Sequence, residues 1–483
     1  MPRPAEPPAG GGEQPGRLVD EPLDCLIDEP PDCPVDERFD CLILGAGVAG
    51  LAAALECQRS GLRPLLLEAA GSAGGRARSY RDRLMGEELD NGPHLLLGAY
   101  HQTLALLETI GTRHLLHPVD RTEFAFFSPE RGHYRFRAPD WPAPLHLLGG
   151  LVAFPPLTWK ERLAALAIAP ALLVDPHRWE TLSVTHWLQK WRQPQALFDH
   201  FWGPLCLAAL NEPPASANAA LFATVLRRAF FGDRRHSQPL IATVPFSRLL
   251  AEPAAARITR LGGRILTAHR VRSLRLNGAR VEAVETDCGS WAGKARPIIA
   301  ALPPRALSEL LPDWAEETGF GRLATAAIVS IHLTYPRPAR IPGGMIGLPF
   351  GTGQWLFDRQ FGNPTPLPEA RISAVISGAY REIHLPRETL VATVRKEIAR
   401  AIPALAEVAP QATRVIKERR ATFATWPETT HLRPGPRTPW ENLFLAGDFT
   451  ATGLPATLEG AVISGQLAAR AVFGLLSSRK KAV

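Results

Sequence analysis

Cysteine is scarce in this sequence, with six among 483 residues. They are Cys25, Cys33, Cys41, Cys57, Cys206 and Cys288. This spacing matches neither a disulfide framework nor the paired ligands of a zinc site. We therefore expect buried, reduced thiols and no metal centre.

Long apolar runs are also missing. The run from Leu163 to Val174 is broken by Pro170, and the segment 141–159 contains four prolines, whereas a membrane-spanning helix needs about 20 continuous apolar residues. Residues 1–39 lack the basic start and apolar stretch of a secretory signal. The sequence predicts no transmembrane helix and a cytoplasmic protein.

Lysine is rare, and arginine takes its place. Of 54 cationic residues seven are lysine and 47 are arginine. Residues 1–38 carry ten acids and three bases, a net charge of −7, so the other 445 residues carry +14 to give the chain its +7. The arginines are dispersed, which disfavours a nucleic-acid partner and suits a diphosphate-bearing cofactor or an anionic lipid surface. General arginine enrichment explains the charge equally well.

The first 38 residues differ from the rest of the chain. They contain nine prolines and few aliphatic residues, too little apolar surface to offset the chain entropy lost on folding. We predict a disordered tail. An eight-residue quasi-repeat begins at Asp20, Asp28 and Asp36; duplication of the entry to the first strand is the simplest explanation, and its cysteines match no usual metal-ligand spacing.

From Phe39 the pattern becomes that of an α/β protein. A buried strand over 40–44, a helix over 48–60 and a strand over 64–68 form a βαβ unit. Helical segments follow at 101–110 and, with interruptions, from 159 to about 231. Strand patterns return at 264–276, 281–286, 297–302, 326–335, 354–358, 371–380 and 443–448, with a last helix at 458–476. Asn277-Gly278 predicts a two-residue hairpin turn.

These segments predict two interleaved domains. A Rossmann-like dinucleotide-binding domain is expected to comprise residues 39–110, 245–310 and 415–476. An α+β substrate domain, partly helical and partly a sheet, is expected to comprise residues 111–244 and 311–414.

A glycine-rich turn joins the first strand to the first helix. Gly45, Gly47 and Gly50 have the spacing GxGxxG, and Glu68 closes the next strand 18 residues beyond Gly50. Gly45 provides the tight turn, Gly47 lets the backbone approach a pyrophosphate, and Gly50 permits close helix packing. Glu68 can accept hydrogen bonds from a ribose, and an acid there disfavours a 2′-phosphate. The motif predicts FAD or NAD.

A second glycine pair, Gly74-Gly75, is followed directly by Arg76. Two glycines and a guanidinium can enclose the other side of a diphosphate, with Arg76 donating charge-assisted hydrogen bonds. With this segment the sequence resembles the flavin-containing amine oxidase and phytoene desaturase superfamily. The resemblance implies FAD, and the binding is expected to be non-covalent because no cysteine follows Cys288 to carry a C-terminal covalent link.

Further segments carry the same resemblance. Asp90-Asn-Gly-Pro-His94 is similar to the superfamily's segment beneath the flavin, and Val271 to a residue on the strand whose backbone meets the adenine. The resemblance implies that Asp448 touches the ribityl chain or diphosphate and that the Leu458 N–H points to flavin O2. The cofactor-binding residues so expected are Gly45, Gly47, Val48, Ala49, Gly50, Glu68, Ala69, Gly74, Gly75, Arg76, Pro93, His94, Val271, Gly447, Asp448, Thr457 and Leu458.

Within the superfamily, segments 90–100, 201–211 and 453–460 are similar to the squalene-associated, FAD-dependent desaturase-like enzymes of bacterial hopanoid pathways. The resemblance implies an oxidoreductase that reduces the apolar triterpenoid hydroxysqualene to squalene with a hydride from flavin N5. It also implies an external electron donor and upstream squalene-pathway synthases as partners. Hydroxide leaves poorly, so a proton donor is needed. His94 is the first candidate and Tyr100 the second; the alternative for His94 is a hydrogen bond to the backbone.

A lipid-soluble substrate suggests a peripheral position on the inner face of the membrane. An amphipathic pattern suited to the interface precedes Lys160 and Arg162. Its apolar members are Trp141, Leu145, Leu147, Leu148, Leu151, Phe154 and Trp159.

Three alternatives stay open on the sequence. A carotenoid-type desaturase or saturase has the same fold and the same reactive flavin atom, so the motifs separate it poorly. A flavin amine oxidase would show two aromatic residues flanking the flavin, for which five tyrosines and Trp426 give no convincing pair. A non-catalytic prenyl-lipid binder need not keep Arg76, Asp448 and the last helix start together.

Overall fold

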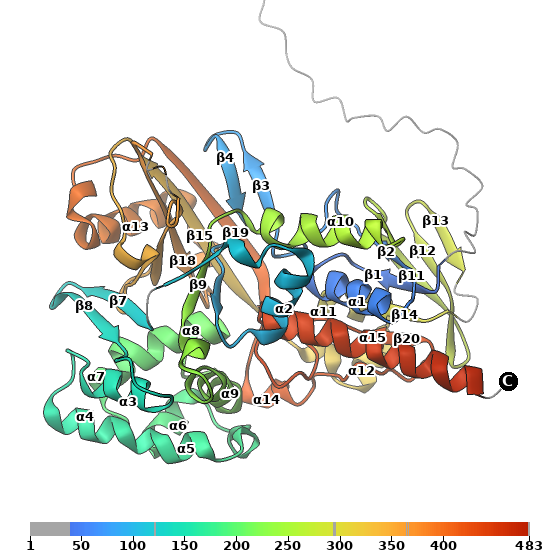
Figure 1. Ribbon diagram of the computed structural model, residues 1–483, viewed down its shortest axis with the longest axis horizontal. Coiled ribbons are helices and arrows are strands. Elements are labelled where there is room, and N and C mark those ends of the chain that lie inside the picture. Colours follow the sequence, from blue (N-terminus) through green and yellow to red (C-terminus); the bar gives the residue numbers. More distant parts are fainter. Residues whose placement is uncertain (1–38, 120–121, 293–295, 364, 366, 482–483) are drawn as a thin grey trace, which may run out of the picture. The chain divides into compact units, whose positions relative to one another are not determined.

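The computed structural model describes residues 39–119, 122–292, 296–363, 365 and 367–481 (Figure 1). The predicted tail with its repeat, including Cys25 and Cys33, lies outside these residues. Cys41, Cys57 and Cys206 are buried free thiols, as predicted, whereas Cys288 is exposed. The prediction of a buried thiol is wrong for Cys288 because it lies in the turn after β12 (Arg280–Thr286).

A parallel sheet carries the predicted βαβ unit. Its strands lie in the order β10-β2-β1-β14-β20, and each neighbouring pair is parallel. They are β1 Cys41–Leu44, β2 Pro64–Leu67, β10 Arg264–Leu266, β14 Ile298–Ala300 and β20 Leu443–Leu445. This sheet confirms the α/β fold class. All three chain segments expected for the dinucleotide-binding domain contribute strands to it, while the division into domains stays a prediction.

Helices cover both faces of the parallel sheet. On one face α1 (Val48–Arg59) and α15 (Leu458–Lys481) lie side by side, with α2 (His101–Ile110) and α10 (Glu252–Arg260) in the same apolar core (Figure 1). The other face packs against α11 (Pro304–Leu310), α12 (Pro312–Glu317) and a small antiparallel sheet. That sheet contains β11 (Val271–Asn277), β12 and β13 (Gly289–Ala292).

Helix α15 is the one helix, among the described residues, that is long and apolar enough to cross a membrane, over Leu458–Ser478. The sequence shows no continuous apolar run over this helix because Glu459 and Arg470 interrupt it. Val462 and Ala468 are fully buried in the core shared with α1. A Cβ on Gly465 would lie 2.2 Å from the Ala49 carbonyl oxygen. This close packing is typical of a core helix.

The segment 264–276 forms two strands instead of the single one predicted. Arg264–Leu266 joins the parallel sheet as β10, and β11 begins at Val271 in the antiparallel sheet. Ala268 between them has a φ of 57°, and this turn moves the chain from one sheet to the other. The predicted hairpin forms, but its two-residue turn is Gly278-Ala279, one position later than expected, because Asn277 pairs with Arg280; Gly278 has a φ of 55°.

A second, mixed sheet has seven strands in the order β19-β15-β18-β17-β16-β7-β8. They are β7 Glu123–Ser128, β8 Gly132–Arg137, β15 Thr325–Tyr335, β16 Met345–Gly347, β17 Trp355–Asp358, β18 Ala370–Ile376 and β19 Ala412–Phe423. The strands predicted at 326–335, 354–358 and 371–380 are confirmed as β15, β17 and β18. The strands β7, β8, β16 and β19 were not predicted from the sequence. Helix α13 (Arg387–Ala401) packs against this sheet.

The predicted helical part follows β8 and lies at the lower left of Figure 1. Its helices are α3 Leu145–Val152, α4 Trp159–Ala165, α5 Ala169–Leu173, α6 Val184–Lys190, α7 Gln195–Leu197, α8 Gly203–Leu210 and α9 Ala219–Phe230. Three residues of the predicted interfacial pattern, Leu147, Leu151 and Phe154, are instead buried in the core shared with β7 and β8. They lie on the inward side of the α3 segment, so that part of the prediction is wrong.

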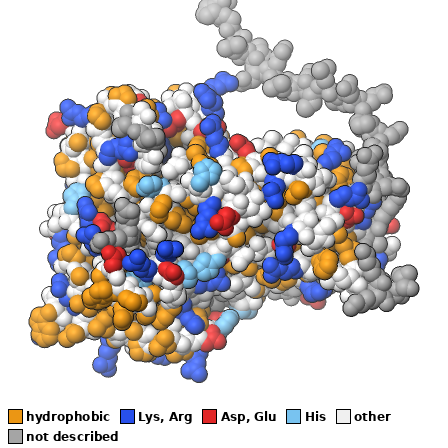
Figure 2. Space-filling model, in the orientation of Figure 1, with side chains coloured by type: hydrophobic (Ala, Val, Ile, Leu, Met, Phe, Trp, Pro, Cys, Tyr) orange, Lys and Arg blue, Asp and Glu red, His pale blue; other side chains and the backbone are white. Residues whose placement is uncertain are grey.

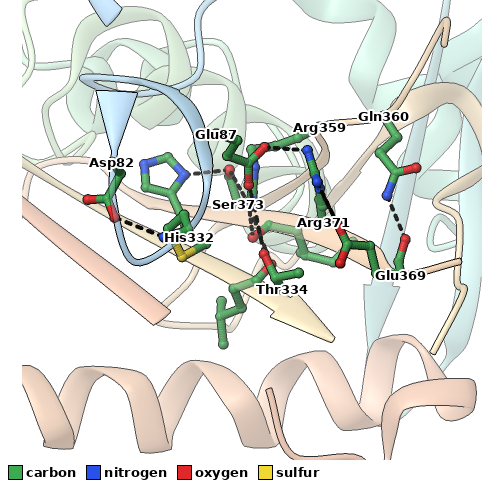
Figure 3. Close-up of polar contacts among 12 residues, drawn as sticks. Asp82, Glu87, His332, Thr334, Arg359, Gln360, Glu369, Arg371 and Ser373 are labelled. Carbon is green, nitrogen blue, oxygen red and sulfur yellow. Dashed lines mark hydrogen bonds and ion pairs between the residues drawn. The ribbon is translucent and has the colours of Figure 1, made fainter. Parts of the chain in front are cut away.

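A buried ionic cluster ties the β3–β4 hairpin (β3 Ser79–Asp82, β4 Glu87–Asp90) to the seven-stranded sheet (Figure 3). Glu87 accepts hydrogen bonds from Arg359 Nη2 at 2.7 Å and from Arg371 Nη1 at 2.9 Å. The Glu87 and Arg359 side chains are only 14% and 13% exposed. These charges are therefore paired largely away from solvent.

Asp82 and His332, labelled in Figure 3, are two more buried side chains of the same region. Asp82 pairs with Arg414 of β19, and His332 Nδ1 lies 2.7 Å from Ser373 Oγ. The hairpin directly follows the Arg76 segment and ends at Asp90. The cluster therefore positions both predicted cofactor segments against the substrate-side sheet.

Candidate cofactor and active site

The glycine-rich turn has the backbone that a dinucleotide requires. Gly45 has a φ of 99°, and a Cβ there would lie 2.5 Å from the Ala301 carbonyl oxygen. A Cβ on Gly50 would lie 2.0 Å from the Gly45 carbonyl oxygen. Helix α1 begins after Gly47 with no side-chain cap and no acid in its first turn. Its first N–H groups can therefore bind the diphosphate of a cofactor.

Glu68 is held at the carboxyl end of β2. Its two oxygens accept hydrogen bonds from the Ala46 and Ala70 N–H groups, each at 2.8 Å. Each oxygen keeps a further lone pair that can accept a ribose hydroxyl. The His269 N–H donates to the Glu68 carbonyl at 2.8 Å, so the chain leading to Val271 passes beside Glu68. The structure thus brings the ribose and adenine candidates to one end of the sheet, with Ala69 between Glu68 and Ala70.

The second glycine segment lies against the first. The Gly74 N–H donates to the Ala46 carbonyl at 2.9 Å, and a Cβ on Gly75 would lie 3.1 Å from Gly47 Cα. Both glycines have positive φ, 116° and 59°. Side chains at these positions would be strained and would fill the space between the two turns, where the diphosphate is expected.

Arg76 and Asp448 contact each other. Arg76 Nη2 donates to Asp448 Oδ1 at 2.6 Å, and Nη1 donates to the Ala421 carbonyl at 2.6 Å. Burial acts to lower the pKa of Arg76, but the charge and hydrogen bond of Asp448 outweigh it and raise the pKa. The guanidinium is thus a fixed cation beside the glycine turns. It joins residues 372 positions apart in the sequence.

The last predicted segment places the start of α15 in the same region. The Gly447 N–H donates to Ser464 Oγ at 2.9 Å. Thr457 Oγ1 accepts from the Gly460 N–H at 3.1 Å, which caps the helix that begins at Leu458. The contact of the Leu458 N–H with flavin O2 stays a prediction.

His94 lies in a loop that Asp90 fixes. Asp90 Oδ1 accepts from Ser79 Oγ at 2.6 Å and from the Phe246 N–H at 2.9 Å. The Phe246 ring lies 4.6 Å from the His94 ring, centroid to centroid. Burial, and then the charge of Arg76, lower the pKa of His94 to about 4. The imidazole is therefore neutral at neutral pH, a form suited to contact with a cofactor and poorly suited to proton donation. Pro93 lies in the same loop, directly before His94.

Tyr100 lies at the start of α2 and packs against the core of the parallel sheet. Burial, and then the charge of Glu459, raise the pKa of Tyr100. The Glu459 carboxylate accepts hydrogen bonds from the Gln102 and Thr103 N–H groups. This arrangement caps α2, so the surroundings of Tyr100 serve helix packing. The catalytic roles of His94 and Tyr100 stay predictions.

The sequence patterns did not indicate that Asn211, at the end of α8, forms hydrogen bonds with distant segments. Asn211 ends this helix with a φ of 54°. Its Nδ2 donates to Thr422 Oγ1 at 2.9 Å, and its Oδ1 accepts from the Gly378 N–H at 2.6 Å. Thr422 adjoins Ala421, whose carbonyl accepts from Arg76. The segment 201–211 thus reaches the cofactor site through β19.

Glu212 follows Asn211 and is fully buried. Its carboxyl accepts hydrogen bonds from the Tyr380 hydroxyl and, at 3.1 Å, from Ser216 Oγ. Burial raises the pKa of Glu212 in spite of these hydrogen bonds, which act to lower it. One signal in the sequence could have identified it: Glu212 is the first charged residue after an uncharged stretch that begins at Phe201.

Comparisons with known proteins identify the family to which the chain belongs. The chain matches the family described as "Flavin containing amine oxidoreductase" over residues 48–473. It is 36% identical over 437 residues to a hydroxysqualene dehydroxylase of Rhodopseudomonas palustris, a match that covers 89% of this chain and 97% of the relative. It is 32% identical over 439 residues to a hydroxysqualene dehydroxylase of Sinorhizobium fredii, covering 88% and 96%.

Identity is lower with another group of the same superfamily. A 15-cis-phytoene desaturase of an Oncidium hybrid cultivar is 27% identical over 459 residues, covering 89% of this chain and 77% of the relative. A solved oxidoreductase from Methanosarcina mazei superposes with a TM-score of 0.69 at 16% identity, covering 90% and 99%, and shows the shared fold. The chain therefore belongs to the flavin containing amine oxidoreductase family, in the group that includes the hydroxysqualene dehydroxylases, and this family implies FAD as the cofactor.

Proposed function

We propose that the protein removes the hydroxyl group of hydroxysqualene reductively, giving squalene and water. The main support is the near full-length similarity to hydroxysqualene dehydroxylases at 36% and 32% identity, against 27% for the phytoene desaturase. The intact set of cofactor residues supports a working flavoenzyme and disfavours a lipid carrier.

We propose that FAD binds without a covalent link. No cysteine follows Cys288 in the sequence. The turn 45–50 and the pair Gly74-Gly75 would enclose the diphosphate, Glu68 would hold the ribose, and Arg76 would supply the compensating charge. When bound in its reduced state, FAD supplies a hydride. The protein must then orient the allylic carbon, exclude water and deliver a proton to the leaving oxygen.

The supply of electrons and substrate completes the proposal. The sequence has one dinucleotide fingerprint, at residues 45–50, so we propose an external electron donor that reduces the FAD. Synthases earlier in the squalene pathway would supply the hydroxysqualene.

An anaerobic turnover tests the proposed reaction. The purified protein is reduced with dithionite, hydroxysqualene is added, and flavin absorbance and extracted squalene are followed together. We expect one squalene for each flavin reoxidised, and FAD released into solution by acid precipitation. A flavin that stays reduced would refute the substrate, reoxidation by phytoene-like polyenes alone would favour a desaturase or saturase, and failure to take up FAD would favour a lipid binder.

We also propose that the protein works peripherally on the cytoplasmic face of a membrane, through an exposed apolar surface that we call the α3–α5 patch. Figure 2 shows apolar side chains gathered over these helices at the lower left. The patch consists of Trp141, Leu145, Val152, Trp159, Leu163 and Leu173, each 41–70% exposed. Lys160 and Arg162 stand beside it, as a surface on anionic lipid requires.

Liposome sedimentation at low salt tests this position. The wild type should sediment with vesicles that contain anionic lipid, and the triple variant Trp159→Ser, Leu163→Ser, Leu173→Ser should stay in the supernatant. Leu84→Ser is the matched control because Leu84 is 71% exposed on the β3–β4 hairpin. Equal sedimentation of the triple variant and the control would refute the proposal.

A further inference from the structure

We infer that Tyr380 donates the proton that converts the leaving hydroxyl into water, and that Glu212 resupplies that proton. The inference rests on the proposed function, because a proton donor is needed only where a C–O bond is broken. It assigns the role to two residues that the sequence motifs do not mark.

The two side chains meet through a fixed junction between segments. Glu212 follows α8 and Tyr380 follows β18, and their side chains form a hydrogen bond. One residue before Glu212, Asn211 accepts from the Gly378 N–H, where the chain turns with a φ of 56°. Because this hydrogen bond from the Gly378 N–H to Asn211 Oδ1 joins the two segments next to the pair, the hydroxyl and carboxyl keep their distance without help from a ligand.

Exposure separates the two roles. Tyr380 is 37% exposed, whereas Glu212 is 0% exposed. A ligand can therefore contact the tyrosine, whereas the Glu212 carboxyl lies behind it and contacts the Tyr380 hydroxyl and Ser216 Oγ. This makes Tyr380 the catalytic candidate and Glu212 a positioning residue that acts through it.

The pair is linked to the cofactor segments through β19. Asn211 bonds to Thr422 of β19, and the neighbouring Ala421 carbonyl accepts from Arg76 at 2.6 Å. The indole of Trp426 adjoins both Glu212 and Tyr380. From Trp426 the chain continues through α14 (Pro427–Thr430) to β20 and Asp448. The pair thus stands where the cofactor-binding sheet and the substrate-side sheet are joined.

The surroundings of Glu212 extend upward the pH range in which its carboxyl holds a proton. The titratable groups that face it are Tyr380 and, on α8, Cys206, whose Sγ lies 3.6 Å from the Glu212 carbonyl oxygen. No cation is among the groups that shift its pKa, and burial raises that pKa. A protonated Glu212 donates to the Tyr380 oxygen, which leaves the tyrosine O–H free to point to a substrate oxygen.

The proton balance of the step is complete. The C–O bond breaks with its electron pair on oxygen, and that oxygen takes the Tyr380 proton and departs as water. Glu212 passes its own proton to Tyr380 and later regains one from solvent. The allylic carbon receives its hydride from the reduced cofactor of the proposed function.

Single-turnover experiments with the reduced holoenzyme test this assignment. Hydroxysqualene is added anaerobically to wild type, Tyr380→Phe, Glu212→Gln and the control Tyr80→Phe, which removes a hydroxyl from the β3–β4 hairpin. We expect squalene formation to slow about 100-fold or more in Tyr380→Phe, the size of a general-acid contribution. FAD content and reoxidation of the reduced flavin by oxygen should match the wild type, and Tyr80→Phe should react normally.

Two further measurements distinguish proton transfer from a structural role. The wild-type rate should fall at high pH as Glu212 loses its proton, and Glu212→Gln should lack this fall. The acetate ester of hydroxysqualene, whose leaving group needs no proton, should react at similar rates with wild type and Tyr380→Phe. An active wild type with an unimpaired Tyr380→Phe would overturn the inference, as would a Glu212→Gln that keeps the wild-type pH profile; no squalene from wild type would refute the proposed function itself.

Discussion

The two sheets of this protein contribute different kinds of atoms to the candidate site: one contributes backbone atoms and the other side chains. The parallel sheet contributes backbone: Gly45, Gly47, Gly74 and Gly75 bring main-chain atoms close together and leave room for a diphosphate. The seven-stranded sheet and the segments packed on it contribute side chains, such as Tyr380 with Glu212 after α8, and two arginines with Glu87 of the β3–β4 hairpin. A backbone site depends on neighbours in the sequence, whereas a side-chain site depends on contacts between distant segments.

Substitution of Gly50 by alanine should have the largest effect, because it disrupts the backbone part of the site. Its Cβ would lie 2.0 Å from the Gly45 carbonyl oxygen, so the turn and α1 cannot keep their packing. We expect near-complete loss of bound FAD, measured as flavin absorbance per protein. Gly71→Ala is the matched control because a Cβ there meets nothing within 4 Å. A Gly50→Ala protein with full flavin would show that the close turn is not required.

Glu87→Gln should disrupt the side-chain contacts that attach the β3–β4 hairpin to the seven-stranded sheet. It leaves Arg359 and Arg371 without their shared carboxylate in a largely buried position, a change that typically costs about 3 kcal/mol or more. The free energy of unfolding, measured in urea with FAD present, should fall by that amount. Glu309→Gln, which removes an exposed pair with Arg305, should cost under about 1 kcal/mol. Equal losses would mean that the cluster adds nothing to the hairpin's attachment.

Acid should lower the free energy of unfolding through His332, a buried residue of the seven-stranded sheet. Burial is the main reason that its pKa falls to about 3, while in the unfolded chain it is about 6.5. As pH falls, His332 binds a proton in the unfolded state before it does so in the folded state. The protein therefore keeps its full stability with respect to His332 above about pH 6.5 and loses stability as the pH decreases toward 3. The expected loss between pH 7 and pH 5 is about 2 kcal/mol.

The variant His332→Asn tests this pH dependence. Its urea unfolding midpoint should change less between pH 7 and pH 5 than that of wild type, and His431→Asn, at an exposed position, should behave as wild type. The same pH dependence in His332→Asn and wild type would assign the acid sensitivity to other groups, of which His94, with a pKa of about 4, has the same sign.

Arg76→Gln should have the smallest effect, and it separates the contribution of one side chain to FAD binding from that of the glycine backbone. The variant keeps the glycine turns but loses the cation that pairs with Asp448. We expect the Kd for FAD, measured by titration of the apoprotein, to rise about 10-fold, the value of one charge-assisted hydrogen bond. Arg83→Gln, at an exposed position of the β3–β4 hairpin, is the control. An unchanged Kd would show that the backbone alone binds the cofactor.

The same contrast explains which predictions succeeded. The βαβ unit, the hairpin near Asn277-Gly278 and the last strand and helix follow from local patterns, and the structure confirms them. The strands β7 and β8 escaped notice because they stand beside a long helical region. The split of 264–276 also escaped notice, since a single turn at Ala268 assigns its halves to different sheets.

The sequence by itself determined the glycine-rich turns and the membership of the flavin family, because close backbone packing and positive φ leave glycine as the suitable residue at those positions. The role of Glu68 in binding a ribose stays a prediction. Only the tertiary structure decided that Arg76 pairs with Asp448, that Phe154 is buried while Trp159 is exposed, and that Glu212 lies against Tyr380. These contacts join residues tens to hundreds of positions apart. No local periodicity specifies such distances, since they arise when the sheets and helices pack.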